Sequence, residues 1–173
     1  MEITPEFLTA DYEGEPGKRT FFLQSRTEEG VVSFLIEKQQ VALLADRMRE
    51  LLLLIDEADT VKDARPERDP SMSMVIPAEA EWRVGTMGLA YDETTDSISL
   101  MLRRIEESPE EDLERDDEDF DVRFMLRRDQ VRAFALHASA VVEEGRPICQ
   151  LCGLPMDPGG HQCPASNGHR LSG

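Results

Sequence analysis

The chain has little of the residue types that mark several common protein classes. Its 173 residues include three cysteines, three histidines and one tryptophan, and 19 basic residues stand against 36 acidic ones, a net charge of 19 − 36 = −17. Affinity for nucleic acid comes largely from Lys and Arg at the phosphates, so this balance opposes binding along a nucleic-acid backbone. Only a local basic groove would overcome that penalty.

Long apolar runs and a secretion signal are also missing. No run approaches the ~20 apolar residues that span a bilayer, and the acidic segment 1–6 has no signal-peptide pattern. We therefore expect a soluble cytoplasmic protein without a membrane segment. Reducing conditions there keep thiols free, which favours metal ligation over disulfides.

The order of the elements predicts an α+β fold. Short segments rich in aromatic and β-branched residues, separated by hairpin-length turns, predict strands, and apolar residues spaced by three and four predict helices. The stretch 57–80 has no periodicity and several prolines and acids, so we interpret it as a linker. The expected strands are 7–12, 19–25, 31–37, 81–91, 97–104 and 120–126, and the expected helices are 38–56 and 129–144.

The two halves of the chain resemble each other at an offset of ninety residues. Residues 34–41 align with 124–131, and the apolar stripes of the helices that follow align as well. Such matching predicts two β-β-β-α repeats, 7–56 and 81–144, with antiparallel sheet pairing and helices packed over one core. Chance similarity between two amphipathic helices is the alternative. Identical residues occupy four aligned pairs: Phe34 and Phe124, Gln40 and Gln130, Val41 and Val131, Ala45 and Ala135.

All three cysteines gather in one motif near the C-terminus. Cys149-x2-Cys152 is followed by His161-x-Cys163, a spacing that predicts a tetrahedral Zn²⁺ site. His169 is an alternative to His161 as the fourth ligand. A closed site of three thiolates and one imidazole leaves no position for water or substrate, so the predicted zinc is structural.

The motif also divides the chain. We expect a small zinc-binding tail, 146–173, attached to an α+β domain of 1–145. One alternative is a loose tail with three unligated thiols, and another is a redox Cys-x2-Cys pair. The redox pair is less consistent with this sequence, because redox pairs begin a helix and this pair follows a helix end.

Three features outside the motif have more than one interpretation. Leu43, Leu53 and Leu54 fall beside or off the apolar stripe of the first helix, which indicates a surface covered by a loop or an interface with a partner or second copy. The segment 106–121 contains eleven acids in sixteen residues and indicates a solvated loop between strands, a cation site, or a docking segment for a basic partner. His137 lies at the boundary of the second helix's apolar stripe, which indicates a boundary residue, with a catalytic base as the less favoured interpretation.

The sequence contains no nucleophile–histidine–acid pattern and no G-x-S-x-G turn, so we name no catalytic residue. We interpret the chain as a zinc-binding adaptor or regulator that acts through protein contacts, and a homo-oligomer is compatible with this. One alternative is a single-strand nucleic-acid binder similar to the whirly or Pur-type proteins, with Phe21, Phe22, Trp82 and Arg83 as contacts. The second alternative is an enzyme whose site assembles without a recognisable motif.

Three segments, 19–24, 37–41 and 83–87, together with the tail, resemble an actinobacterial domain-of-unknown-function family over nearly the full length. The family's tail reads roughly Gly-Arg-Pro-x-Cys-x-x-Cys-Gly-x-Pro-x-Asp-Pro-x-Gly-His-x-Cys-Pro, and residues 145–164 match it. Its members commonly end Asn-Gly-Tyr where this chain has Asn167-Gly168-His169, which favours His161 over His169 as a ligand. The resemblance also implies a shared pathway with a histidine-phosphatase-like or phosphatidylinositol-kinase-like protein as partner.

Overall fold

The computed structural model describes residues 1–116, 118–144 and 150–152, and its chain forms two compact units, Met1–Val142 and Glu143–Gly173. We call the first unit the body. The described elements are β1 (Glu2–Ile3), β2 (Phe7–Glu13), β3 (Thr20–Thr27), β4 (Gly30–Ile36), α1 (Lys38–Ile55), the 3-10 turns η1 (Thr60–Lys62) and η2 (Pro70–Met72), β5 (Ala80–Asp92), β6 (Ser97–Arg104), α2 (Pro109–Glu114), β7 (Val122–Leu126) and α3 (Arg128–Glu143).

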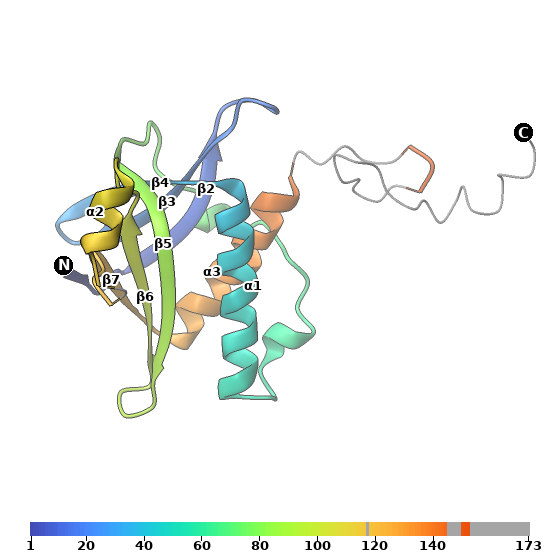
Figure 1. The fold of residues 1–173 in the computed structure, drawn as a ribbon. Coiled ribbons are helices and arrows are strands. Elements are labelled where there is room, and N and C mark those ends of the chain that lie inside the picture. Colours follow the sequence, from blue (N-terminus) through green and yellow to red (C-terminus); the bar gives the residue numbers. More distant parts are fainter. Residues whose placement is uncertain (117, 145–149, 153–173) are drawn as a thin grey trace, which may run out of the picture. The chain divides into compact units, whose positions relative to one another are not determined.

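The predicted α+β class is confirmed: the described residues form one seven-stranded sheet and three α-helices (Figure 1). The strand order is β1-β7-β6-β5-β4-β3-β2. Pairing is antiparallel within β2–β3–β4 and within β5–β6–β7, as expected, but β4 and β5 are parallel, and so are β1 and β7. The sheet is therefore mixed, because α1 carries the chain back between β4 and β5 and a helical crossover joins parallel strands.

The sheet is strongly curled. Its edge strands are β1 and β2, yet only residues 4–6 join them. Six spacings of ~4.8 Å put the edges of a flat seven-stranded sheet about 29 Å apart, whereas four steps of extended chain reach about 14 Å. The edges must therefore approach each other at this end. Gln130 at the start of α3 holds the link there, with its Nε2 donating to the carbonyl of Pro5 at 2.9 Å.

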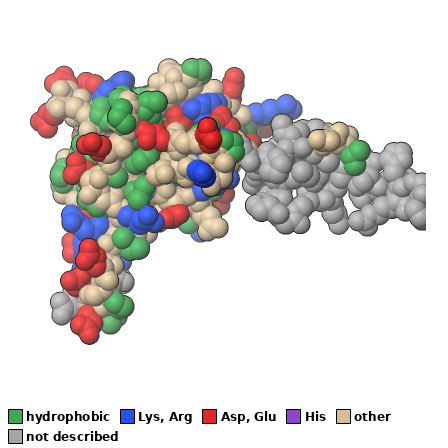
Figure 2. Space-filling model, turned by 90° about the horizontal axis from the view of Figure 1, so that it is seen from above, with side chains coloured by type: hydrophobic (Ala, Val, Ile, Leu, Met, Phe, Trp, Pro, Cys, Tyr) green, Lys and Arg blue, Asp and Glu red, His purple; other side chains and the backbone are tan. Residues whose placement is uncertain are grey.

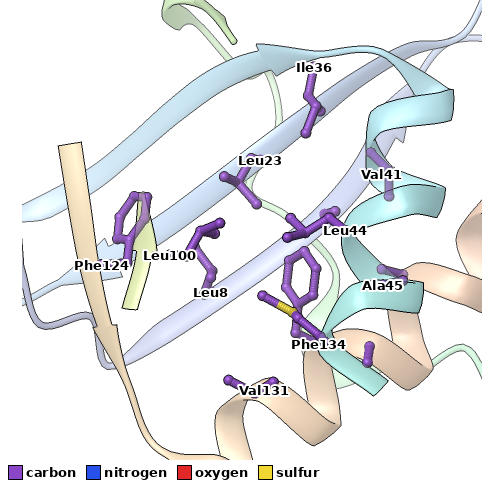
Figure 3. Packing of buried hydrophobic residues seen from close by; sticks show 14 of the residues in the cluster. Leu8, Leu23, Ile36, Val41, Leu44, Ala45, Leu100, Phe124, Val131 and Phe134 are labelled. Carbon is purple, nitrogen blue, oxygen red and sulfur yellow. The ribbon is translucent and has the colours of Figure 1, made fainter. Parts of the chain in front are cut away.

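One hydrophobic core lies between the sheet and the two long helices. Figure 3 shows side chains from strands and from both helices pointing into the same interior. The rings of Phe34 on β4 and Phe124 on β7 have centroids 6.1 Å apart although two strands separate them in the sheet, which is a direct effect of the curl. The helices contribute the buried side chains of Val41, Leu44, Ala45, Met48 and Leu52 from α1, and Val131, Phe134, Ala135, Ala138 and Val141 from α3.

Residues 57–79, which we call the strap, connect the halves and pack along β2 and β3 as they do so. Gln24 donates to the carbonyl of Val75 at 3.0 Å and accepts from its N–H at 2.7 Å, and Thr9 donates to the carbonyl of Met72 at 2.6 Å. Thr9 alternates with the core residue Leu8, so the backbone of the strap at residues 72–75 lies on the face of β2 that points away from the helices. Polar side chains make these contacts, which is why apolar periodicity gives no sign of them.

None of the described helices combines the length and the apolar character that a membrane span requires.

Candidate functional site

The predicted zinc ligands fall almost entirely outside the described residues. Cys149, His161, Cys163 and the alternative ligand His169 all lie there, whereas Cys152 is described and is partly exposed. Within residues 1–116, 118–144 and 150–152, no three His, Cys, Asp or Glu side chains gather as a metal site would require.

The body carries an apolar groove between α1 and β5, which we call the α1–β5 groove. Its volume is about 370 Å³. Leu54 is 83% exposed and Leu43 is 52% exposed, and both lie on the outward side of α1. The groove is lined by Leu43, Leu44, Arg47, Glu50, Leu51, Leu54, Met87, Gly88 and Leu89.

The structure separates the three leucines that the sequence grouped together. Leu53 is half-buried and packs against the core, whereas Leu43 and Leu54 remain exposed. The described loops do not cover these two side chains. The sequence did not predict that Met87 to Leu89 form the opposite wall of the groove. Apolar and polar residues alternate in the same way whether the strand packs in a core or lines a groove.

The charged groups near the groove differ between its middle and one end. In the middle, Arg47 and Glu50 form an exposed ion pair at 3.1 Å, a kind that contributes little stability. α1 and β5 run in the same direction (Figure 1), and beyond Leu54 and Leu89 both continue into exposed acids. These are Asp56 and Glu57 after α1 and Asp92 and Glu93 in the β5–β6 turn.

A second cluster of chemistry-bearing residues lies between the strap and α3. Asp59 in the strap forms a bidentate pair with Arg132, with 2.9 Å from Arg132 Nε to Oδ1. This hydrogen bonding outweighs the effect of burial and holds the pKa of Asp59 below its ordinary value. His137 was expected at the stripe boundary, but it is 1% exposed, and its Nδ1 accepts from the N–H of Asp69 at 3.0 Å. Both pairs attach the strap to the helix.

Within its described residues, 106–116 and 118–121, the acidic segment is not a loop throughout. It contains the short helix α2, and Arg115 binds Glu106 at 2.5 Å, Asp119 at 3.1 Å and Asp121 at 3.3 Å. The hydrogen bond that Arg115 donates to Glu106 raises the pKa of Arg115 above its ordinary value, so the guanidinium remains charged. On the face in Figure 2, acidic and basic side chains are interspersed.

The aromatic residues proposed as nucleic-acid contacts have packing roles. Phe21 and Phe22 are each 6% exposed. Trp82 packs on Phe34 with ring centroids 4.6 Å apart, and Arg83 pairs with a carboxylate of α1's N-terminal cap. Stacking on a base would require the two phenylalanines to leave their buried positions.

No curated protein and no solved structure matches the chain. The model of a family described as "Protein of unknown function (DUF3090)" matches residues 3–163 of the 173. The match covers every regular element from β2 to α3 and ends at Cys163, the last cysteine. The resemblance to a family of unknown function over nearly the full length is thereby confirmed: the chain belongs to the DUF3090 family.

Proposed function

We propose that the protein is a zinc-binding adaptor that acts by binding another protein, and that the α1–β5 groove is its binding surface. The observation that carries this proposal is a pair of exposed leucines on one helix face, opposite Met87 and Leu89. Exposed apolar patches that form one contiguous surface mark interaction sites, whereas single exposed side chains do not.

The geometry of α1 supports a binding surface. Leu43, Arg47, Glu50 and Leu54 are spaced by four, three and four residues, so they share one helix face. Burying Leu43 and Leu54 against a partner would contribute about 1.5–3 kcal/mol for each side chain. The affinity that remains is smaller than this sum, because association also costs translational, rotational and side-chain entropy. A contribution of this size therefore suits an interaction that can be reversed.

The second part of the proposal is a structural zinc ion in the tail, held by Cys149, Cys152, His161 and Cys163. The family match includes all four residues and stops before His169, which supports His161 as the fourth ligand. A closed site of this type stabilises a small module that cannot fold on its own apolar core.

An internal duplication is the third part of the proposal. Gln40 Oε1 accepts from the N–H of Glu37 at 2.9 Å, and Gln130 Oε1 accepts from the N–H of Arg127 at 3.0 Å. Each glutamine thus satisfies the backbone at the start of its helix, ninety residues apart. Each also donates to main-chain carbonyls of a neighbouring strand or link, at Val84 and Gly85 for Gln40 and at Pro5 and Glu6 for Gln130.

Site-specific photo-crosslinking in the native host tests the adaptor proposal. A photoreactive amino acid replaces Leu54, and a matched control replaces Leu113 on α2, which is 85% exposed and outside the groove. We expect an adduct from position 54 that mass spectrometry maps to one segment of one other protein. Equal adducts from both positions, or adducts between copies of this chain alone, would overturn the proposal.

A further inference from the structure

β5 has an open edge over half of its length. In the described register β4 pairs with β5 only at Ser33 with Ala80 and at Leu35 with Arg83. Pairing with β6, by contrast, continues to the end of β5, where Asp92 faces Ser97. Among the described residues, β5 is therefore paired on one side alone from Thr86 to Asp92, and this stretch is about 20 Å long at ~3.3 Å per residue.

The register identifies the backbone groups that point to the open edge. The carbonyl of Leu102 accepts from Asp121 N–H at 2.9 Å, on the β7 side of β6, so Leu102 directs its hydrogen bonds away from β5. Met87 lies opposite Leu102, and Leu89 lies opposite Leu100 two residues along. In an antiparallel pair such residues are not hydrogen-bonded to each other. The N–H and C=O groups of Met87 and Leu89 therefore point away from β6.

That edge forms one wall of the α1–β5 groove. Three successive residues, Met87 to Leu89, line the groove. Only alternate residues would line it if the strand presented one face, so the strand presents its edge. A β-carbon on Gly88 would lie 3.2 Å from Met101 Cε and from Phe120 Cζ, which places Gly88 against side chains of β6 and the β7 approach. α1 lies alongside β5 in Figure 1, with Leu51 and Leu54 lining the opposite wall.

An open strand edge beside an apolar helix face matches one known mode of recognition, in which an extended peptide joins the sheet. Main-chain hydrogen bonds then provide affinity, and alternate side chains enter pockets. A long open edge is otherwise an aggregation hazard that folded proteins cover or pair.

We infer that the α1–β5 groove binds an extended segment of a partner protein, which adds a strand to β5 at residues 86–92. This inference rests on the proposed function and specifies the kind of partner segment that the adaptor binds. The segment has apolar residues at alternate positions facing Leu51, Leu54 and Leu89. It carries Lys or Arg at the end that reaches the acids of the β5–β6 turn, Asp92 and Glu93. A second copy of this chain is disfavoured, because each copy has a net charge of −17.

A defined peptide tests the inference on the full chain. The probe is about nine residues long, the length of an ordinary strand, with alternating valine and threonine and two lysines at one end. Its control is the same peptide N-methylated at alternate residues on the edge that would face β5. We expect the unmodified peptide alone to bind and to slow amide exchange at Met87 and Leu89 at least about tenfold. Equal binding of the methylated peptide, binding of neither, or protection elsewhere overturns the inference.

Two proline variants test the edge itself. Leu89→Pro removes an N–H that points into the groove and also the side chain of Leu89, which packs against the core, so Leu89→Ala is its matched control. We expect Leu89→Pro to be about as stable as Leu89→Ala and to bind the probe at least about tenfold more weakly. Ala90→Pro removes an N–H that pairs with β6, so its melting temperature falls well below that of wild type. A melting temperature of Leu89→Pro far below that of Leu89→Ala would contradict the assigned edge.

The two proposals fail in different ways. If a partner crosslinks at position 54 but the N-methylated and unmodified peptides bind equally well, the adaptor function stands and strand addition is wrong. If the probe adds a strand to β5 but no partner crosslinks in the host, the proposed adaptor function is wrong.

Discussion

Arg132 on α3 holds the buried carboxylate of Asp59 through a bidentate ion pair in which only the arginine reaches solvent. The side chain of Asp59 is 2% exposed and that of Arg132 is 32% exposed. Removing one residue of the ion pair is therefore not equivalent to removing the other. Loss of the arginine leaves a buried charge, whereas loss of the carboxylate leaves a cation that water can hydrate.

Arg132→Met is therefore expected to destabilise the body by about 3–5 kcal/mol. The measurement is denaturant unfolding of the full chain, followed by a probe of the body. Asp59→Leu leaves a partly exposed arginine and removes the acceptor of the Val61 N–H, and it should still cost less than Arg132→Met. The double variant should regain part of the loss of Arg132→Met. A larger effect of Asp59→Leu than of Arg132→Met would contradict this account.

The same pair predicts a pH dependence. The pKa of Asp59 is lowered, mainly by its hydrogen bond to Arg132. The stabilisation is complete above the unfolded pKa of about 3.9 and is lost as pH falls through the lower folded value. In Arg132→Met the folded carboxyl binds protons more readily, so the stability gap to wild type narrows as pH falls from 7 towards 4. Unfolding free energies at several pH values measure this gap, and a gap that widens in acid would refute the assignment.

His137→Leu is expected to loosen the strap without unfolding the core. The N–H of Asp69 loses the Nδ1 acceptor at 3.0 Å, and a buried donor without a partner costs about 1–3 kcal/mol. Hydrogen exchange should become faster at the amides of 66–72. His137→Asn is the matched control, because its Oδ1 replaces Nδ1 as an acceptor at similar distance from the backbone. Equal exchange in the two variants would show that the acceptor does not hold the strap.

Zinc removal should affect the tail and leave the body folded. We expect one zinc ion per chain in protein purified without added metal, retained in His169→Ala and lost in His161→Ala and Cys152→Ser. A chelator should then increase protease cleavage after about residue 145, with no change in cooperative unfolding of the body. Loss of zinc only in His169→Ala would reassign the fourth ligand, and collapse of the body on chelation would exclude a separable module.

The regular elements were largely predictable because each is encoded by local pattern. α1 was expected at 38–56 and spans Lys38–Ile55, and β6 was expected and found at 97–104. The predicted bounds differ from the observed ones mainly at the ends of elements: the last strand was expected to begin at residue 120 and begins at Val122. β1, a two-residue strand at Glu2–Ile3, has too few residues to show any periodicity.

The strap and the buried histidine could not be read from the sequence. Gln24, Asp59 and His137 are polar residues whose burial depends on partners fifty or more positions away. A polar side chain is buried only when such partners satisfy it, and no local window contains that information.

By itself, the sequence determined the α+β composition, the two amphipathic helices, the acidic balance and the grouping of all cysteines in 149–163. These features depend on residue type and short-range spacing. The tertiary structure alone decided that β4 and β5 pair in parallel and then diverge. It also decided that, in the part of the chain that the structure describes, α1 and not another strand lies along the open edge of β5. Strand neighbours and exposed edges arise from contacts between distant segments, which local spacing does not specify.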